Sequence, residues 1–246
     1  MKRWIGRILA ALAVLLVPAV IGFVWWGAHP LKAGPEAIAA LEGDDEVRVS
    51  YGEWIEFRPA AGVPATGLII YPGGHVEASA YAPLAKALAR SGYFAVIPQM
   101  PLSLAVLKPD EAQEIMLANP DITSWIIGGH SLGGAMAAEF VATHPHAVKG
   151  LFLWAAYSVE GTDLSGLLDL EMLSIFGSQD GGVERMRASR DRLPPSAAWV
   201  EIPGGNHAQF GWYGLQPGDG TATISATEQQ RIVVDHMLEL IESAAD

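Results

Sequence analysis

The chain of 246 residues contains no cysteine. This absence excludes disulfide bonds, thiolate zinc sites, a cysteine nucleophile and a lipidated N-terminal cysteine. Basic residues are also scarce: 15 Lys and Arg stand against 27 Asp and Glu, giving a formal net charge of -12. Because a nucleic-acid-binding protein needs a basic face, this balance argues against a nucleic-acid partner. No H-E-x-x-H motif or comparable ligand spacing is present, so we expect no metal site.

Acidic residues are missing from the first 35 positions, where an uncharged run extends from Ile8 to Ala28 behind three cations. A helix of this length is about 30 Å long, roughly the thickness of one hydrocarbon core. Trp4 lies near one end of the run and Trp25-Trp26 at the other, as is typical of aromatic belts. The pattern predicts a membrane anchor in residues 1–29, with residues 8–28 in the bilayer.

The charges that precede the run predict its orientation. Basic residues stay on the cytoplasmic side, so the N-terminus would be cytoplasmic and the rest of this single-pass protein extracytoplasmic. The alternative is a cleaved signal peptide and a secreted protein. Trp26 stands where a cleavage site needs a small residue, and Ala37-Ile38-Ala39 fits better but lies well downstream. We therefore favour a retained anchor, followed by a Pro/Gly-punctuated linker over residues 30–45 that could hold a short helix.

Residues 46–246 alternate short apolar strands with helical segments, which predicts one domain built on a mainly parallel, twisted sheet with helices on both faces. The expected strands are Val47–Phe57 (a pair or one bent strand), Gly67–Tyr71, Tyr93–Ile97, Ser124–Ile127, Leu151–Trp154, Met172–Phe176 and Trp199–Ile202. The expected helices are Tyr81–Arg90, Leu104–Leu117 with a break at Pro109, Ser131–Thr143, Glu184–Leu193, and a terminal helix opened by the capping box Ser225–Glu228 and ending near Ser243.

The segment between two of these strands is too short for a separate lid domain. Only 17 residues lie between Trp154 and Met172. We therefore expect an open site, roofed by the loops at residues 98–107 and 157–169.

A Gly-rich turn with a central serine is the strongest motif in the chain. Gly129-His130-Ser131-Leu132-Gly133 fits G-x-S-x-G, the nucleophile elbow, and stands between an apolar strand and an Ala-rich helix. The serine occupies a strained strand-to-helix corner, and its neighbours must lack side chains so that strand and helix can approach. Ser131 is therefore the predicted nucleophile.

A serine hydroxyl needs a base, and the base needs a carboxylate that fixes its tautomer. In this architecture the order along the chain is Ser, acid, His, each just past a strand. Asp180 follows the strand that ends at Phe176, and His207 follows the strand that ends at Ile202. We predict His207 as the base and Asp180 as its acid. The alternative acids are Glu160, Asp163 and Asp169, whose ordinary role would be solvated loop charge.

The oxyanion hole should take one backbone N–H from Leu132, the residue after the nucleophile, and one from the loop after the Gly67–Tyr71 strand. In that loop Gly74 is the first choice and His75 the second, unless the glycines only form a tight turn. The pocket candidates are His75, Met100 and Phe210, of which the two apolar residues could equally be plain core.

Taken together, these stretches resemble the α/β-hydrolases, and within them the small lidless dienelactone-hydrolase-like group, the alpha/beta hydrolase fold-5 family. The stretches that carry the resemblance are Tyr71–Val76, Tyr81–Ala85, Met100–Ala105, Gly128–Gly134, Gly177–Gly181 and Gly204–Phe210. The resemblance implies a Ser131–His207–Asp180 triad, no cofactor and acyl hydrolysis. Dienelactone hydrolases proper use a cysteine nucleophile, so their substrate does not carry over to a chain without cysteine.

The sequence thus predicts a membrane-tethered serine hydrolase that cleaves a small-molecule carboxylic ester through an acyl-enzyme. The alternatives on the same triad are a thioesterase, a peptidase or an acyltransferase. A fourth is a non-catalytic binding module on the hydrolase fold, because fold does not fix function. The oligomeric state cannot be read from the sequence.

Overall fold

The computed structural model describes residues 2–245, with side chains from residue 14 onward. Eight strands form one sheet in the order β1-β2-β4-β3-β5-β6-β7-β8. They are β1 (Val47–Tyr51), β2 (Trp54–Pro59), β3 (Thr66–Tyr71), β4 (Phe94–Pro98), β5 (Ser124–His130), β6 (Gly150–Trp154), β7 (Glu171–Gly177) and β8 (Ala198–Ile202). β1 and β2 pair antiparallel, as do β2 and β4, and all later pairs are parallel. The mainly parallel sheet is confirmed, and the expected Val47–Phe57 segment is a strand pair.

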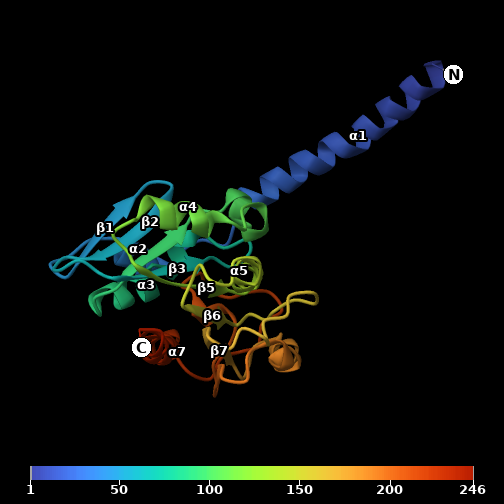
Figure 1. The fold of residues 1–246 in the computed structure, drawn as a ribbon. Coiled ribbons are helices and arrows are strands. Elements are labelled where there is room, and N and C mark those ends of the chain that lie inside the picture. Colours follow the sequence, from blue (N-terminus) through green and yellow to red (C-terminus); the bar gives the residue numbers. More distant parts are fainter. Residues whose placement is uncertain (1, 246) are drawn as a thin grey trace.

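Helices cover both faces of this sheet (Figure 1). The helices of the described chain are α1 (Lys2–Gly27), which does not lie on the sheet, α2 (Pro35–Ala40), α3 (Ala82–Arg90), α4 (Glu111–Ala118), α5 (Leu132–Thr143), α6 (Val183–Ala188) and α7 (Ala226–Ser243). The side chains of α3 and α7 join one core cluster, and those of α4 and α5 join the other. Burial on both faces explains why the central strands read as continuous apolar runs rather than as alternating ones.

The Leu104–Leu117 segment is broken at Pro109 as expected, into the 3₁₀ turn η3 (Ala105–Leu107) and α4, because Pro109 disfavours helical backbone in the residue before it. The expected Glu184–Leu193 helix is shorter than predicted, since the segment divides into α6 and the turn η4 (Arg190–Arg192). The terminal helix begins as predicted, with the Ser225 hydroxyl accepting the Glu228 N–H at 3.1 Å.

Helix α1 extends away from the sheet domain (Figure 1). Its described apolar side chains are largely exposed, including Leu15 at 71% and Trp25 at 64%. Among the described residues, no helix has both the length and the apolar character needed to cross a membrane. Part of the expected anchor, residues 8–13, lies outside the side chains that the structure describes.

The segment after α1, where a linker was expected, contains the short helix α2 and contacts the domain through several bonds. Trp26 stacks on His75 with ring centroids 4.0 Å apart, and Leu31 forms a parallel bridge with Val76. The Ala33 N–H donates to the Glu77 carboxylate at 2.8 Å. Because residues 75–77 lie in the loop after β3, α1 joins the domain at the carboxyl edge of the sheet.

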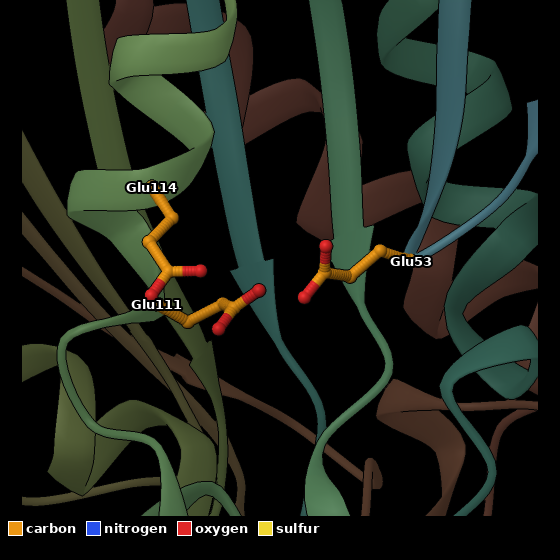
Figure 2. Close-up of side chains that lie close together, drawn as sticks. All are labelled: Glu53, Glu111 and Glu114. Carbon is orange, nitrogen blue, oxygen red and sulfur yellow. The ribbon is translucent and has the colours of Figure 1, made fainter.

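One cluster of three glutamates resembles a cation site in composition. Carboxylate oxygens of Glu53, Glu111 and Glu114 lie within 4.8 Å of one another and are brought together by the turn before β2 and by α4 (Figure 2). Lys108 already serves as the cation: its Nζ lies 3.1 Å from Glu53 and 3.0 Å from Glu114 and also pairs with Glu111. Hydrogen bonds to these carboxylates raise the pKa of Lys108. The cluster is therefore an ion-pair network that joins α4 to the sheet.

We expect Lys108→Met to lower the free energy of unfolding by about 1.5–3 kcal/mol, the usual contribution of a hydrogen bond between charged groups, because a buried carboxylate loses its cation and, among the described residues, keeps only the Trp54 Nε1–H. The group concerned is the Glu111 carboxylate, whose side chain is only 3% exposed. Urea unfolding of the variant measures the change. Lys149→Met, at an exposed lysine with no side-chain bond among the described residues, is the matched control. Equal loss in both variants would contradict the assignment.

Candidate active site

The structure forms the nucleophile elbow at the expected place. β5 ends at His130, α5 begins at Leu132, and Ser131 between them has φ 52° and ψ -120°. A non-glycine residue in this left-handed region is strained, and such strain concentrates at functional sites. The Ser131 N–H donates to the Trp154 carbonyl at 3.0 Å, which fixes the turn against β6.

Close backbone approach explains the glycine at position 133. A Cβ there would overlap the carbonyl oxygens of Tyr71 and Pro72. We expect Gly133→Ala to lower the free energy of unfolding by about 1–3 kcal/mol or more, because an extra methyl group in a packed core forces the surrounding backbone to move. Thermal unfolding measures this. Gly166→Ala is the control, since a Cβ at Gly166 meets nothing within 4 Å. Equal stability of the two variants would show that the elbow tolerates a side chain.

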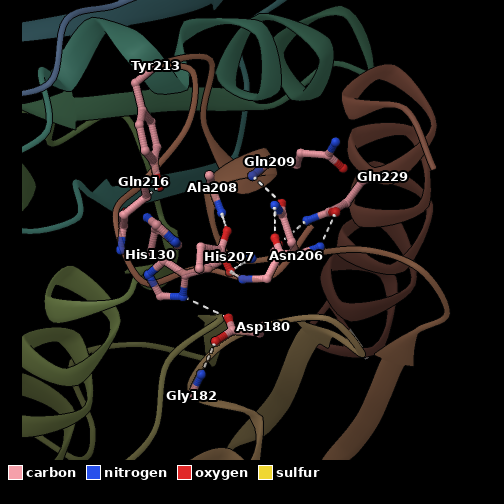
Figure 3. Close-up of polar contacts among 12 residues, drawn as sticks. His130, Asp180, Gly182, Asn206, His207, Ala208, Gln209, Tyr213, Gln216 and Gln229 are labelled. Atoms are coloured by element: carbon pink, nitrogen blue, oxygen red, sulfur yellow. Dashed lines mark hydrogen bonds and ion pairs between the residues drawn. The ribbon is translucent and has the colours of Figure 1, made fainter. Parts of the chain in front are cut away.

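The predicted acid and base form a hydrogen-bonded pair (Figure 3). His207 Nδ1 lies 2.7 Å from Asp180 Oδ2, with the His207 side chain 13% exposed and that of Asp180 2% exposed. The other carboxylate oxygen of Asp180 accepts the Gly182 N–H at 2.6 Å. Since the carboxylate occupies Nδ1, the nitrogen left for a substrate or a serine hydroxyl is Nε2.

Ser131, His207 and Asp180 line one cavity of about 420 Å³. Its walls come from the segments that follow β5, β6, β7 and β8, including the start of α5 and of α6. They include Leu132, Tyr157, Val159, Arg185 and Gln216. The β6–β7 loop contributes part of the expected roof through Tyr157 and Val159, and no separate lid domain is inserted there. None of the alternative acids, Glu160, Asp163 and Asp169, lines this cavity.

The expected apolar pocket residues lie elsewhere. Phe210 is fully buried in a core cluster, and its ring stacks on His130 with centroids 5.8 Å apart. Met100 is 8% exposed and lines a different cavity of about 570 Å³ beneath the base of α1, together with Leu102. The loop at residues 98–107 therefore borders that second cavity rather than the one that holds Ser131, contrary to the expected roof.

The hydrogen bonds of the backbone N–H groups after β3 distinguish the two candidates for the oxyanion hole, Gly74 and His75. The Gly73 N–H donates to the Tyr81 hydroxyl at 3.0 Å, and the His75 N–H donates to the Ser103 carbonyl at 2.8 Å. The N–H groups of Gly74 and Leu132 have no acceptor among the described residues. Gly74 also lies against Leu132, since a Cβ on it would be 2.9 Å from that side chain. Of the loop amides, Gly74 is thus the one free to bind an oxyanion.

The imidazole of His75 faces away from the Ser131 cavity. It stacks on Trp26, and its Nε2 lies 2.8 Å from the Trp26 carbonyl oxygen. His75 does not line the cavity. Its side chain instead joins α1 to the loop that carries Gly74.

A buried pair that the sequence did not reveal connects the loop after β3 to the elbow. His130 is 1% exposed, and its Nδ1 lies 2.8 Å from the Tyr81 hydroxyl. The same hydroxyl accepts the Gly73 N–H at 3.0 Å, so Tyr81 joins the loop after β3 to His130. Burial, with the neighbouring His207 adding to it, lowers the pKa of His130 well below its usual range.

We expect Tyr81→Phe to lower the free energy of unfolding by about 1–3 kcal/mol, because it leaves two buried polar groups without a partner. Those groups are the Gly73 N–H and His130 Nδ1. Chemical denaturation measures the change. Tyr93→Phe is the control, at a half-buried tyrosine whose hydroxyl bonds to no described residue. The account of this pair fails if both variants are equally stable.

A second network, also absent from the sequence prediction, holds the backbone around His207 (Figure 3). The buried Gln229 side chain on α7 accepts the Asn206 N–H at 2.9 Å and donates to the Asn206 carbonyl at 2.8 Å. On the other side, Asp219 accepts the N–H groups of His207 and Ala208. These contacts join segments 10 to 25 positions apart, and no sequence pattern reveals them.

Comparison with known proteins agrees with this geometry. Residues 67–231 match the model of the alpha/beta hydrolase family, including the elbow, Asp180 and His207. The chain belongs to this family. The resemblance drawn from the sequence motifs is therefore confirmed. No curated protein sequence matches the chain.

Solved structures of other alpha/beta hydrolases share the fold at low sequence identity. A predicted CIB-like hydrolase from Thermoplasma acidophilum is 15% identical with a TM-score of 0.59, covering 78% of this chain and 97% of its own. Est1E from Butyrivibrio proteoclasticus, solved with ferulic acid bound, is 13% identical with a TM-score of 0.59, covering 82% and 98%. FphF, a fluorophosphonate-binding serine hydrolase of Staphylococcus aureus, is 13% identical with a TM-score of 0.53, covering 76% and 91%.

Proposed function

We propose that this hydrolase cleaves carboxylic esters through a Ser131–His207–Asp180 triad and an acyl-enzyme. The observation that carries the proposal is the 2.7 Å hydrogen bond between His207 and Asp180 at the cavity that holds Ser131. It fixes one ring nitrogen and leaves the other for the serine proton, as a general base requires. The names of two fold neighbours, a fluorophosphonate-binding serine hydrolase and Est1E with ferulic acid bound, support the same class.

In the proposed reaction Ser131 Oγ attacks the ester carbonyl while His207 Nε2 takes its proton. The N–H groups of Gly74 and Leu132 stabilise the negative charge on the carbonyl oxygen. His207 then gives its proton to the leaving alcohol, and the acyl group remains on Ser131. A water molecule, deprotonated by His207, hydrolyses this acyl-enzyme. Asp180 orients His207 and stabilises its charged form throughout.

A chain-length series of p-nitrophenyl esters and matched thioesters tests this proposal on the full chain in detergent. We expect ester turnover that depends on Ser131, with thioesters cleaved more slowly. Faster thioester turnover would favour a thioesterase instead. Absence of turnover on every member, with the protein folded, would favour a binding module on this fold.

We further propose that residues 8–28 anchor the protein in a bilayer, with the catalytic domain outside the cytoplasm. The exposed apolar side chains of α1 and the basic residues before it support this proposal. Because α1 joins the carboxyl edge of the sheet, such an anchor would hold the candidate site close to the membrane. The alternative remains cleavage and secretion, which the intact mass of the mature protein tests.

The absence of cysteine allows a clean test of the anchor by single labelled thiols. Val20→Cys lies in α1, and Val63→Cys lies in the exposed turn before β3, at the opposite edge of the sheet. We expect doxyl lipids in vesicles to quench a fluorophore at position 20 and to leave one at position 63 bright. Equal fluorescence at the two positions would contradict membrane anchoring and leave the catalytic proposal untouched.

A further inference from the structure

The loop that follows η5 (Ala208–Phe210) crosses both the acid loop and the base loop of the candidate site. Its backbone lies directly on the turn that carries Asp180. A Cβ on Gly181 would lie 2.5 Å from the Gly218 carbonyl oxygen, and a Cβ on Gly220 would overlap that of Gln179. No side chain fits between the two turns, so the crossing loop and the Asp180 turn are fixed relative to each other.

The carboxylate of this crossing loop, Asp219, holds the backbone at His207. Its Oδ1 accepts the His207 N–H at 3.2 Å, and its Oδ2 accepts the Ala208 N–H at 2.8 Å. Oδ1 also accepts the Gly220 N–H at 2.8 Å, which fixes the carboxylate within its own turn. The two carboxylate oxygens of Asp219 thus bind two consecutive backbone amides. Such a bidentate contact fixes the geometry of the partner as well as contributing binding energy.

The remaining contacts of the His207 segment are made by neutral groups. Gln229 bonds the backbone of Asn206, and the Asn206 amide donates to the Gly220 carbonyl at 2.9 Å. Among the described residues, Asp219 is therefore the one charged group that binds the His207 backbone. Asp180 bonds to the imidazole of His207 and not to its backbone. The two carboxylates thus act on different parts of the same histidine.

We propose that Asp219 is a positioning residue of this site, which holds the His207 backbone so that the imidazole stays on Asp180 and faces Ser131. This inference rests on the proposed triad chemistry. Asp219 takes no proton and touches no reacting atom. Its effect is on the fraction of time in which His207 has the geometry for proton transfer, and a displacement of about 1 Å can cost 100-fold in rate.

Turnover of p-nitrophenyl acetate by Asp219→Asn and by Asp219→Ala in the full chain tests the proposal. Asparagine keeps the size but replaces one acceptor oxygen with an amino group, so one of the two backbone amides loses its acceptor. We expect kcat to fall by about 10- to 100-fold with KM changed less than about twofold. The downfield proton resonance of the His207 Nδ1–H should broaden or vanish in both variants.

Two further measurements separate positioning from folding. Asp219 is partly exposed, so formate can enter the space left in Asp219→Ala and should restore part of kcat. Asp163→Ala is the matched control, because Asp163 also accepts a backbone N–H, that of Ser165 at 2.9 Å, but does not line the cavity. It should retain wild-type kcat and the downfield resonance.

Wild-type kcat in Asp219→Asn, or no effect of formate on Asp219→Ala, would overturn the inference. So would failure of both variants to fold, because the role of Asp219 would then be structural. A wild-type protein without turnover would instead overturn the proposed function, while loss of turnover in Asp219→Asn alone would support both proposals.

Discussion

Ser131→Ala should lower kcat for a p-nitrophenyl ester by about six orders of magnitude, as removal of a triad nucleophile does when the triad acts as a unit. The hydroxyl is the only group in the proposed mechanism that forms a covalent bond to the acyl carbon. A residual rate of roughly 10³ to 10⁴ over water is expected from the oxyanion amides and binding. Steady-state kinetics of the purified full chain measure the loss.

The control for this substitution is Ser196→Ala, at an exposed serine in the loop before β8. It should leave kcat unchanged. A positioned general base alone contributes about 10²- to 10⁴-fold to the rate. A Ser131→Ala variant that keeps more than about a hundredth of the wild-type rate would therefore exclude the serine as nucleophile.

Asp180→Asn is the substitution with the second largest expected effect, a fall in kcat of about 10⁴-fold. The amide keeps the shape of the side chain but can present its amino group to His207 Nδ1. The imidazole would then accept at Nδ1 and carry its proton on Nε2, where it cannot take the proton of Ser131. Steady-state kinetics on the same ester measure the fall.

Asp169→Asn serves as the control because Asp169 was the alternative acid nearest to β7 and is exposed. Its kcat should match that of the wild type. If the two asparagine variants lost activity equally, the acid of the site would have to be assigned anew.

The order of short motifs along the chain was enough to predict that Asp180 and His207 lie together. The elbow, Asp180 and His207 each follow a strand of a parallel sheet, and parallel strands bring their carboxyl ends to one edge. The contact between Asp180 and His207 then depends on the local geometry of the Gly-rich turns that carry these two residues. The structure adds the reason for choosing Gly74 over His75, because only the folded loop reveals that the His75 amide is already bonded to Ser103.

The parts that sequence reasoning missed are contacts between distant segments. Tyr81 and His130 are 49 positions apart and meet in a buried hydrogen bond, and Asp219 reaches His207 from a Gly-rich loop without regular structure. Neither contact has a periodicity or a spacing that a single sequence displays. Met100 and Phe210 were chosen for their apolar character, which is shared by core residues and pocket residues alike.

The contacts of the segment after α1 could not be predicted for a related reason. Pro and Gly around Leu31 predicted a linker, and the structure adds that backbone bonds and the Trp26–His75 stack hold this segment on the loop after β3. Backbone hydrogen bonds of this kind need no particular side chain, so composition does not reveal them. The consequence is functional, since the segment lies beside the loop that carries Gly74.

Reaction with a fluorophosphonate, followed by intact-mass analysis and peptide mapping, tests the central claim most directly, because it asks whether Ser131 is an activated nucleophile without requiring the natural ester. The account predicts one adduct per chain, on Ser131, forming rapidly in the wild type and far more slowly in His207→Ala. Absence of an adduct in folded protein, or an adduct on another residue, would contradict it.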